Sequence, residues 1–155
     1  MLAMSDYGWA AGPECISAVM ACPGPIAELG SGASTRAFEA AGRWVLSIEH
    51  DMNWLLPRGT LCPLVNGWYD VDKLAHALAT FTRYGVLFVD GPVGSEDRCR
   101  FHAHAWMFRH DVPWIFDDVS RAPELAMVKA LSEETGRAYD VVEVGKPFAI
   151  LEAVG

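Results

Sequence analysis

The sequence lacks an apolar run of about 18 residues, the length that a membrane-spanning helix needs. Its opening stretch, MLAMSDYGWAAGPE, also lacks the basic segment and apolar block of a secretion signal. The four cysteines form no C-x-x-C pair, which argues against a zinc site and favours reduced thiols. Low-complexity tracts, repeats and linkers are missing as well. We therefore expect a cytoplasmic protein with one globular domain over residues 1–155.

Positive charge is scarce. Lys and Arg number 12 against 20 Asp and Glu, for a formal net charge of -8. Binding to a nucleic-acid backbone or an anionic membrane requires clustered Lys and Arg. We therefore expect no nucleic-acid partner and no membrane partner, and a small molecule as the substrate.

Short apolar runs alternate with segments of helical spacing. The runs predict strands at residues 26–29, 44–48, 61–65, 85–89, 112–116, 139–144 and 148–152. The spacing predicts helices at residues 13–20, 34–41, 72–82, 95–109 and 123–135. Strands without polar alternation are typical of a mostly parallel sheet with helices on both faces. The last two strands, joined by Gly-Lys-Pro, suit a hairpin, so the fold class is α/β.

Glycine or carboxylate residues follow four of the predicted strands. They are Gly30-Ser31-Gly32, Glu49, Asp90 and Asp117-Asp118. In an open parallel sheet, ligands bind outside the carboxyl ends of the strands. The sequence therefore predicts one ligand site at this edge of the sheet.

The stretch AELGSGAST contains the glycine turn of that edge. Gly30 allows a sharp reversal, and Gly32 lets a ligand approach the backbone. Ser34 or Thr35 can cap the following helix, whose N–H groups would face the ligand. Thr35 stands where the dinucleotide-binding fingerprint needs a third glycine. The alternative to a ligand-binding turn is an ordinary structural turn.

Glu49 follows Gly30 by 19 residues and ends the second predicted strand. A carboxylate at that position can accept hydrogen bonds from both hydroxyls of a ribose. This feature fits NAD as well as S-adenosylmethionine, and a solvated strand-end Glu is the alternative.

Four segments together resemble the class I S-adenosylmethionine-dependent methyltransferases: ELGSGAST, SIEHD with a following Trp54, LFVDGP and IFDDVSR. The chain is most similar to a small group of them with a G-S-G-x-S-T turn and an E-H-D strand end. The resemblance covers residues 13–152. It implies a seven-stranded Rossmann-like methyltransferase fold that ends in an antiparallel hairpin, with S-adenosylmethionine as the cofactor and a small molecule as the methyl acceptor.

The resemblance also implies roles for the residues around the glycine turn. Glu28 would fix the methionine amino group of the cofactor through the loop. Gly30, Ser31 and Gly32 would pack under its methionyl and ribose parts, and Thr35 would belong to the turn.

At the other end of the cofactor, Glu49 would hold the ribose and His50 would lie beside the adenine. Trp68 or Tyr69 would stack on the adenine ring, or else belong to the core. Asn66 and Asp70 are further candidates for contact with the adenine amine.

The carboxylates after the fourth and fifth parallel strands concern the chemistry. The resemblance places the end of the fourth strand beside the reactive methyl group, so Asp90 would also contact the cofactor. There it would act as the general base for a hydroxyl acceptor, or anchor the acceptor. A second reading makes Asp90, Asp117 and Asp118 ligands of Mg²⁺, as in cation-dependent O-methyltransferases. Plain structural roles are the alternative: a turn at Asp90, a helix cap at Asp118 and a backbone contact at Asp117.

Arg98, Arg100 and Arg121 lie just beyond these strand ends. They could bind an anionic acceptor, balance the charge of the acidic cluster or form a solvated helix face. Two other functions stay open. One is a NAD- or nucleotide-binding oxidoreductase, and the other is a non-catalytic subunit that binds S-adenosylmethionine. The short chain leaves an open site, which suits a small substrate or closure by a partner subunit such as a second copy.

Overall fold

The computed structural model describes residues 10–155. Within that range, the central sheet has the strands β1 (Ile26–Leu29), β2 (Val45–Glu49), β3 (Thr60–Leu61), β6 (Val86–Val89), β7 (Trp114–Phe116), β8 (Tyr139–Val142) and β9 (Phe148–Leu151). Their order is β3-β2-β1-β6-β7-β9-β8. The strands β1, β2, β3, β6 and β7 pair in parallel, and β9 pairs antiparallel with β7 and β8. The predicted sheet with its antiparallel C-terminal hairpin is confirmed.

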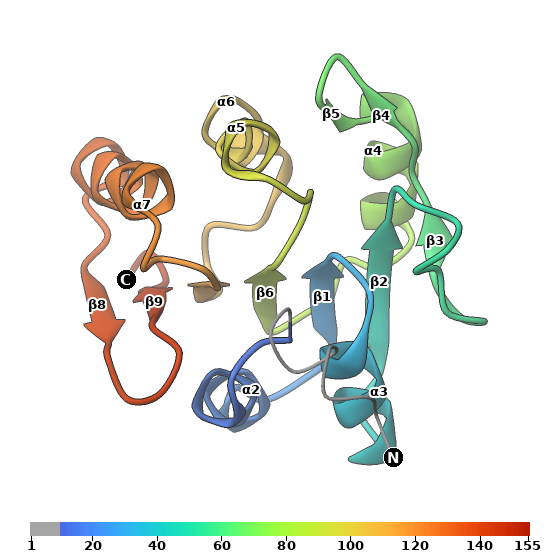
Figure 1. The fold of residues 1–155 in the computed structure, drawn as a ribbon, viewed down its shortest axis with the longest axis horizontal. Helices are drawn as coiled ribbons and strands as arrows, with labels where there is room; N and C mark the ends of the chain where they lie inside the picture. Colours follow the sequence, from blue (N-terminus) through green and yellow to red (C-terminus); the bar gives the residue numbers. More distant parts are fainter. Residues whose placement is uncertain (1–9) are drawn as a thin grey trace.

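Helices cover both faces of this sheet (Figure 1). On one face lie α2 (Pro13–Ala21) and α3 (Ala33–Ala40). On the other lie α4 (Val71–Ala79), α5 (Ser95–Arg98), α6 (Phe101–His104) and α7 (Ala122–Thr135). Within residues 10–155, no helix combines the length and the apolar character needed to cross a membrane.

Strand side chains alternate between two hydrophobic clusters, one on each face. In β6, Val86 and Phe88 pack with residues of α2, whereas Leu87 and Val89 pack under α4 to α7. All four side chains are fully buried. Burial on both faces explains why the apolar runs show no polar alternation.

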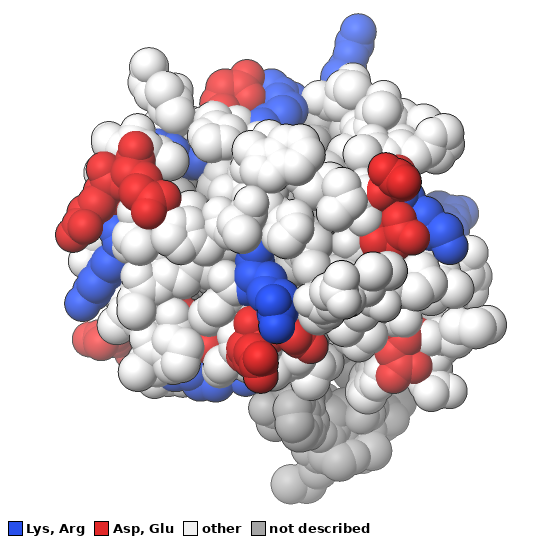
Figure 2. All heavy atoms as spheres, turned by 90° about the horizontal axis from the view of Figure 1, so that it is seen from above, with Lys and Arg blue, Asp and Glu red and all other residues white. Residues whose placement is uncertain are grey.

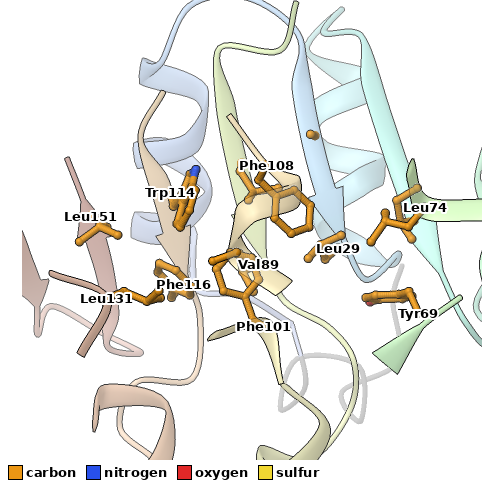
Figure 3. Close-up of a cluster of buried hydrophobic side chains, with 14 of the residues drawn as sticks. Leu29, Tyr69, Leu74, Val89, Phe101, Phe108, Trp114, Phe116, Leu131 and Leu151 are labelled. Carbon is orange, nitrogen blue, oxygen red and sulfur yellow. The ribbon is translucent and has the colours of Figure 1, made fainter. Parts of the chain in front are cut away.

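The cluster under α4 to α7, part of which Figure 3 shows, contains several aromatic side chains that contact one another. The Phe101 ring lies 5.2 Å from Phe108 and 5.3 Å from both Trp114 and Phe116, measured between ring centroids. Burying each such side chain stabilises the fold by roughly 1.5–3 kcal/mol. This cluster holds β6 and β7 in register beneath the helices and so fixes the edge that carries Asp90 and Asp117.

The predicted strand at residues 61–65 is two separate pieces. Thr60–Leu61 forms β3 in the main sheet, and β4 (Leu64–Val65) pairs antiparallel with β5 (Trp68–Tyr69) in a second sheet. Pro63 stands between the two pieces and has no N–H to donate to a sheet ladder. The proline therefore ends one strand before the other begins.

The predicted helix at residues 95–109 is also broken, into α5, α6 and the short 3₁₀ helix η1 (Ala105–Met107). The breaks let Phe101 and Phe108 stack face to face, with 13° between their ring planes. They also leave Arg98 at the end of α5, where its guanidinium reaches the carbonyl of Pro92 at 2.8 Å. Core packing thus outweighs continuous helical hydrogen bonding in this segment.

Charged side chains of both signs are interspersed on the face seen in Figure 2. The Lys and Arg side chains drawn there stand singly among Asp, Glu and uncharged residues. Among the described residues of this face, positive charge is not concentrated in one patch.

Candidate functional site

A cavity of about 770 Å³ opens at the carboxyl ends of β1, β2 and β6. It includes seven of the residues for which the sequence predicted contact with the cofactor or a metal: Gly30, Ser31, Gly32, Glu49, His50, Asp90 and Asp118. Seven other candidates are not among its lining residues: Glu28, Thr35, Asn66, Trp68, Tyr69, Asp70 and Asp117. The predicted ligand edge therefore exists, and half of its expected residues face the space where a ligand would lie.

The two glycines of the turn have different physical roles. Gly30 has a φ of +95°, and a Cβ atom there would lie 2.5 Å from the carbonyl oxygen of Asp90. Only glycine fits this position, because the turn after β1 touches the turn after β6. A Cβ at Gly32 would meet no atom within 4 Å, since that position faces the cavity. Gly32 leaves an open surface of backbone for a ligand.

Glu49 is joined directly to the glycine turn. The N–H of Ser31 donates to Oε1 of Glu49 at 3.0 Å, while Oε2 accepts the N–H groups of His50 and Asp51 at 2.8 Å and 2.9 Å. An ionised carboxylate has about four acceptor positions, so Oε1 keeps one for a ligand hydroxyl. These bonds also hold the carboxylate at the cavity wall.

Glu28 supports the turn from beneath. Its fully buried carboxylate accepts hydrogen bonds from Ser34 at 2.5 Å, Thr35 at 2.5 Å and Ser47 at 2.9 Å. Burial raises the pKa of Glu28 to about 7, although these hydroxyl groups oppose the rise. Ser47 also contacts the Ser31 hydroxyl at 2.5 Å, so the network reaches the cavity lining. The structure thus places Glu28 and Thr35 as supports of the turn, out of reach of a ligand in the cavity.

The loop after β2 adds to the predicted His50 two cavity residues to which the sequence gave no role, Asn53 and Trp54. His50 lines the cavity beside Glu49, with 3.3 Å between its Nδ1 and Oε2 of Glu49. Beyond it, Asn53 and Trp54 line the same wall, and Trp54 is half exposed. The signal that could have found Trp54 is a large aromatic residue in an irregular segment just after a ligand-binding strand end.

Trp68 and Tyr69 lie in the core, each only 1% exposed. Trp68 stacks on His104 with 5.0 Å between ring centroids, and its edge meets Tyr69 at 5.1 Å. Because both side chains are enclosed by protein, the structure does not offer either ring to an adenine in the cavity. Both residues therefore have the core role that the sequence left open as the alternative to adenine stacking.

Asp90, Asp117 and Asp118 each place a carboxylate oxygen within 4.8 Å of the others. Asp90 and Asp118 face the cavity, whereas Asp117 is buried at 1% exposure. Asp118 has a φ of +60°, in the left-handed region that Asp tolerates better than most residues. Its position confirms that the ends of β6 and β7 deliver carboxylates to one place.

Protein cations already pair with this cluster. Nζ of Lys146 lies 2.9 Å from Oδ2 of Asp117 and 2.9 Å from Oδ1 of Asp118. Nη1 of Arg98 lies 2.8 Å from Oδ2 of Asp118 and 3.8 Å from Oδ1 of Asp90. The nearby Arg121 adds a contact of 3.2 Å to Asp118. Lys146 and Arg98 therefore pair with the three carboxylates, and Arg121 is shared between Asp118 and the buried Glu124.

The pKa values within the cluster shift in opposite directions. Burial, and then the neighbouring charge of Asp117, raises the pKa of Asp90 well above its ordinary value. Burial alone would raise the pKa of Asp118 too, but hydrogen bonds from Lys146 and Arg98 outweigh it and lower that pKa. The environment thus holds Asp118 ionised and makes Asp90 the better proton acceptor of the two.

The cluster as arranged does not fit Mg²⁺. Carboxylate oxygens are suitable ligands for that ion. However, both oxygens of Asp118 and one of Asp117 already contact Lys146 or an arginine.

The three arginines predicted near the site have carboxylate partners. Arg98 and Arg121 line the cavity but pair with the carboxylates of the cluster, and Arg100 pairs instead with Asp97 and the exposed Glu96. Arg98 and Arg121 are therefore already paired with carboxylates at the cavity, and Arg100 lies in ion pairs on the surface.

No family model matches the sequence, and no curated protein resembles it closely enough to count as a match. Solved structures do match. A methyltransferase from Podospora anserina with bound S-adenosylhomocysteine aligns with a TM-score of 0.61 at 12% identity, covering 97% of this chain and 82% of that one. A Bacteroides fragilis methyltransferase, also with S-adenosylhomocysteine, aligns with a TM-score of 0.58 at 11% identity over 99% and 83%.

The fold is that of the class I methyltransferases. The MycE methyltransferase of the mycinamycin pathway, solved with Mg and S-adenosylhomocysteine, aligns with a TM-score of 0.52 at 13% identity over 83% of this chain and 41% of that one. The seven-stranded, mostly parallel sheet and its closing hairpin are those expected from the sequence. At such identities the likeness concerns the fold alone.

Proposed function

We propose that this protein transfers the methyl group of S-adenosylmethionine to a small-molecule acceptor. The observation that carries the proposal is the hydrogen bond from the Ser31 N–H to Glu49. It joins the glycine turn to the carboxylate expected to bind a ribose, in one wall of the cavity. The volume of the cavity, about 770 Å³, lies within the usual range of small-molecule sites, about 300–1,000 Å³. The four free thiols support a cytoplasmic location.

The cofactor would lie along the wall from the turn to the loop after β2. Its methionyl part would rest on the open backbone at Gly32, and a ribose hydroxyl would donate to the free position on Oε1 of Glu49. Its adenine would lie between His50 and Trp54, which line the wall beyond Glu49. The neighbours with bound S-adenosylhomocysteine support this choice of cofactor.

Asp90 would serve the transfer step when the acceptor is a hydroxyl group. The acceptor oxygen would form a bond to the methyl carbon while the carbon–sulfur bond breaks, and sulfur would keep that electron pair. Asp90 would take the hydroxyl proton, which suits a carboxylate at the cavity wall with a raised pKa. In-line displacement depends mainly on positioning, which the rigid turn after β6 would supply. No step of this scheme requires a divalent cation.

Calorimetry with S-adenosylhomocysteine and NAD tests the cofactor. We expect binding of the first and none of the second. Glu49→Gln should weaken binding about 10- to 100-fold, because charge-assisted hydrogen bonds contribute about 1.5–3 kcal/mol. Glu133→Gln, which changes an exposed carboxylate, serves as the control. Tight NAD binding without S-adenosylhomocysteine binding would replace our proposal with the oxidoreductase alternative.

Transfer from labelled S-adenosylmethionine into a metabolite extract tests catalysis. Asp90→Asn should lower the rate by about 10²- to 10⁴-fold, the usual contribution of a general base, with little change in cofactor affinity. Asp140→Asn is the control, since Asp140 is exposed and lies on the far hairpin strand. If the wild-type protein labels no compound, the chain is a cofactor-binding subunit without catalysis.

A further inference from the structure

The hairpin turn between β8 and β9 delivers a lysine to the carboxylate cluster. Because β9 runs antiparallel to β7, with Ala149 opposite Phe116, the start of β9 lies at the carboxyl end of β7. Lys146 is two residues before β9 and therefore stands beside Asp117, 29 residues away in the sequence. Its ammonium group also donates to the carbonyl of Ala10 at 3.3 Å, so three protein acceptors contact the ammonium.

The ammonium bridges two carboxylates at the point where the sequence suggested a metal. It lies 2.9 Å from one oxygen of Asp117 and 2.9 Å from one oxygen of Asp118. A divalent ion bound to the same two oxygens at about 2.1 Å would lie within about 4 Å of the ammonium. Two such cations repel each other strongly in a buried site, so only one of them can occupy this position.

A second observation marks the position as a cation site. Asp117 is 1% exposed, and its Oδ1 has no hydrogen-bond partner among the described residues. A buried carboxylate is costly without compensating charge, and Lys146 is the only cation within 4 Å of Asp117 in the described part of the chain. If the lysine were neutral, Asp117 would have oxygens available on both sides for another cation.

We propose that Lys146 acts as a tethered cation that takes the place of a divalent metal at Asp90, Asp117 and Asp118, and that removing its charge converts the cluster into a divalent-metal site. Lys146 is a positioning residue in this scheme, because it holds Asp117 and Asp118, and Asp118 lines the cavity. Its importance for methyl transfer rests on the proposed function, whereas its exclusion of a metal does not.

Binding of Mn²⁺, followed by loss of the free-ion electron paramagnetic resonance signal, tests the exclusion. Wild type, Lys146→Arg and the exposed-surface control Lys129→Met should bind no stoichiometric Mn²⁺. Lys146→Met should bind one ion per chain, at least about tenfold more tightly than wild type. The substitution frees carboxylate oxygens of Asp117 and Asp118, and Mn²⁺, like Mg²⁺, prefers oxygen ligands. Adding Asp117→Asn to Lys146→Met should abolish that binding.

Two results would overturn the proposal. One is a wild-type protein that binds a single Mn²⁺ as tightly as Lys146→Met. The other is the absence of any gain in both Lys146→Met and the polar variant Lys146→Gln. Circular dichroism with and without Mn²⁺ follows folding, and folding of a neutral variant only when Mn²⁺ is added would itself support the metal site.

S-adenosylhomocysteine calorimetry on the same samples separates this inference from the proposed function. If Mn²⁺ binds as expected but no sample binds the cofactor product, the cation replacement stands and the methyltransferase proposal fails. If the product binds but the Mn²⁺ pattern is absent, only the cation replacement fails. Wild-type transfer should be unaffected by EDTA, and transfer by Lys146→Met should increase when Mg²⁺ is added.

Discussion

Gly30 and Gly32 stand two positions apart in one turn, yet their substitution should have opposite effects. Gly30→Ala should destabilise the fold by about 1–3 kcal/mol, because a Cβ would lie 2.5 Å from the Asp90 carbonyl at a φ of +95°. Gly32→Ala should cost at most about 1 kcal/mol, since a Cβ there meets no atom, but should weaken S-adenosylhomocysteine binding about tenfold or more. Thermal unfolding and calorimetry measure the two effects.

The pair of variants carries its own control, because each glycine is compared with the other. Equal loss of stability in both would show that the turn is only a structural feature. A Gly32→Ala protein that binds the ligand as tightly as wild type would contradict the placement of the cofactor over this backbone.

Glu28 should make the free energy of unfolding depend on pH. Its pKa is raised from 4.5 to about 7 in the folded protein, so the folded state keeps a proton that the unfolded state loses. Stability therefore falls as pH rises between about 4.5 and 7, by roughly 3 kcal/mol from this group, and does not change further above that window. Glu28→Gln should remove this decline.

Urea unfolding of wild type and Glu28→Gln at pH 5 and pH 8 checks the effect, with Glu133→Gln as the matched exposed control. The stability of the variant relative to wild type should rise between the two pH values. An equal difference at both would mean that Glu28 is ionised throughout, held by its three hydroxyl donors.

The small β4–β5 sheet shows how an aromatic pair near a strand end can belong to the core. Trp68→Phe should lower stability by about 1–2 kcal/mol through lost packing while leaving S-adenosylhomocysteine affinity unchanged. Trp54→Ala should do the reverse, because Trp54 is half exposed and lines the cavity. Thermal unfolding and calorimetry on both variants decide between them. Weaker binding by a stable Trp68→Phe protein would restore the adenine-stacking role.

Helix and strand boundaries varied in how well local pattern predicted them. Strand 26–29 was predicted to the residue, since an apolar run ends at Gly30 and both faces of β1 are buried. The helix expected at 95–109 is broken into short pieces, because Phe101 and Phe108 stack on each other and both pack against Trp114 of β7. Helical spacing reports an apolar face, but it does not report whether the backbone must bend to place that face.

The cavity as a unit joins five stretches of chain: the turn after β1, the loop after β2, the turn after β6, the start of α7 and the residues before α2. Strand order brings the first three together, since β1 lies between β2 and β6. The edge and its main carboxylates could therefore be predicted from strand ends alone. Trp54 and Lys146 could not, because each reaches the site through a loop whose path depends on packing.

The sequence by itself determined the fold class, the order of the strand-end residues, and the position of the glycine turn before Glu49. Those features follow from local periodicity and from the rule that parallel strands end at one edge. Only the tertiary structure decided which side chains face the cavity and which cations neutralise Asp117 and Asp118. Burial and charge pairing depend on segments far apart in the chain: β9 runs antiparallel to β7, and this direction brings Lys146 to the carboxylates.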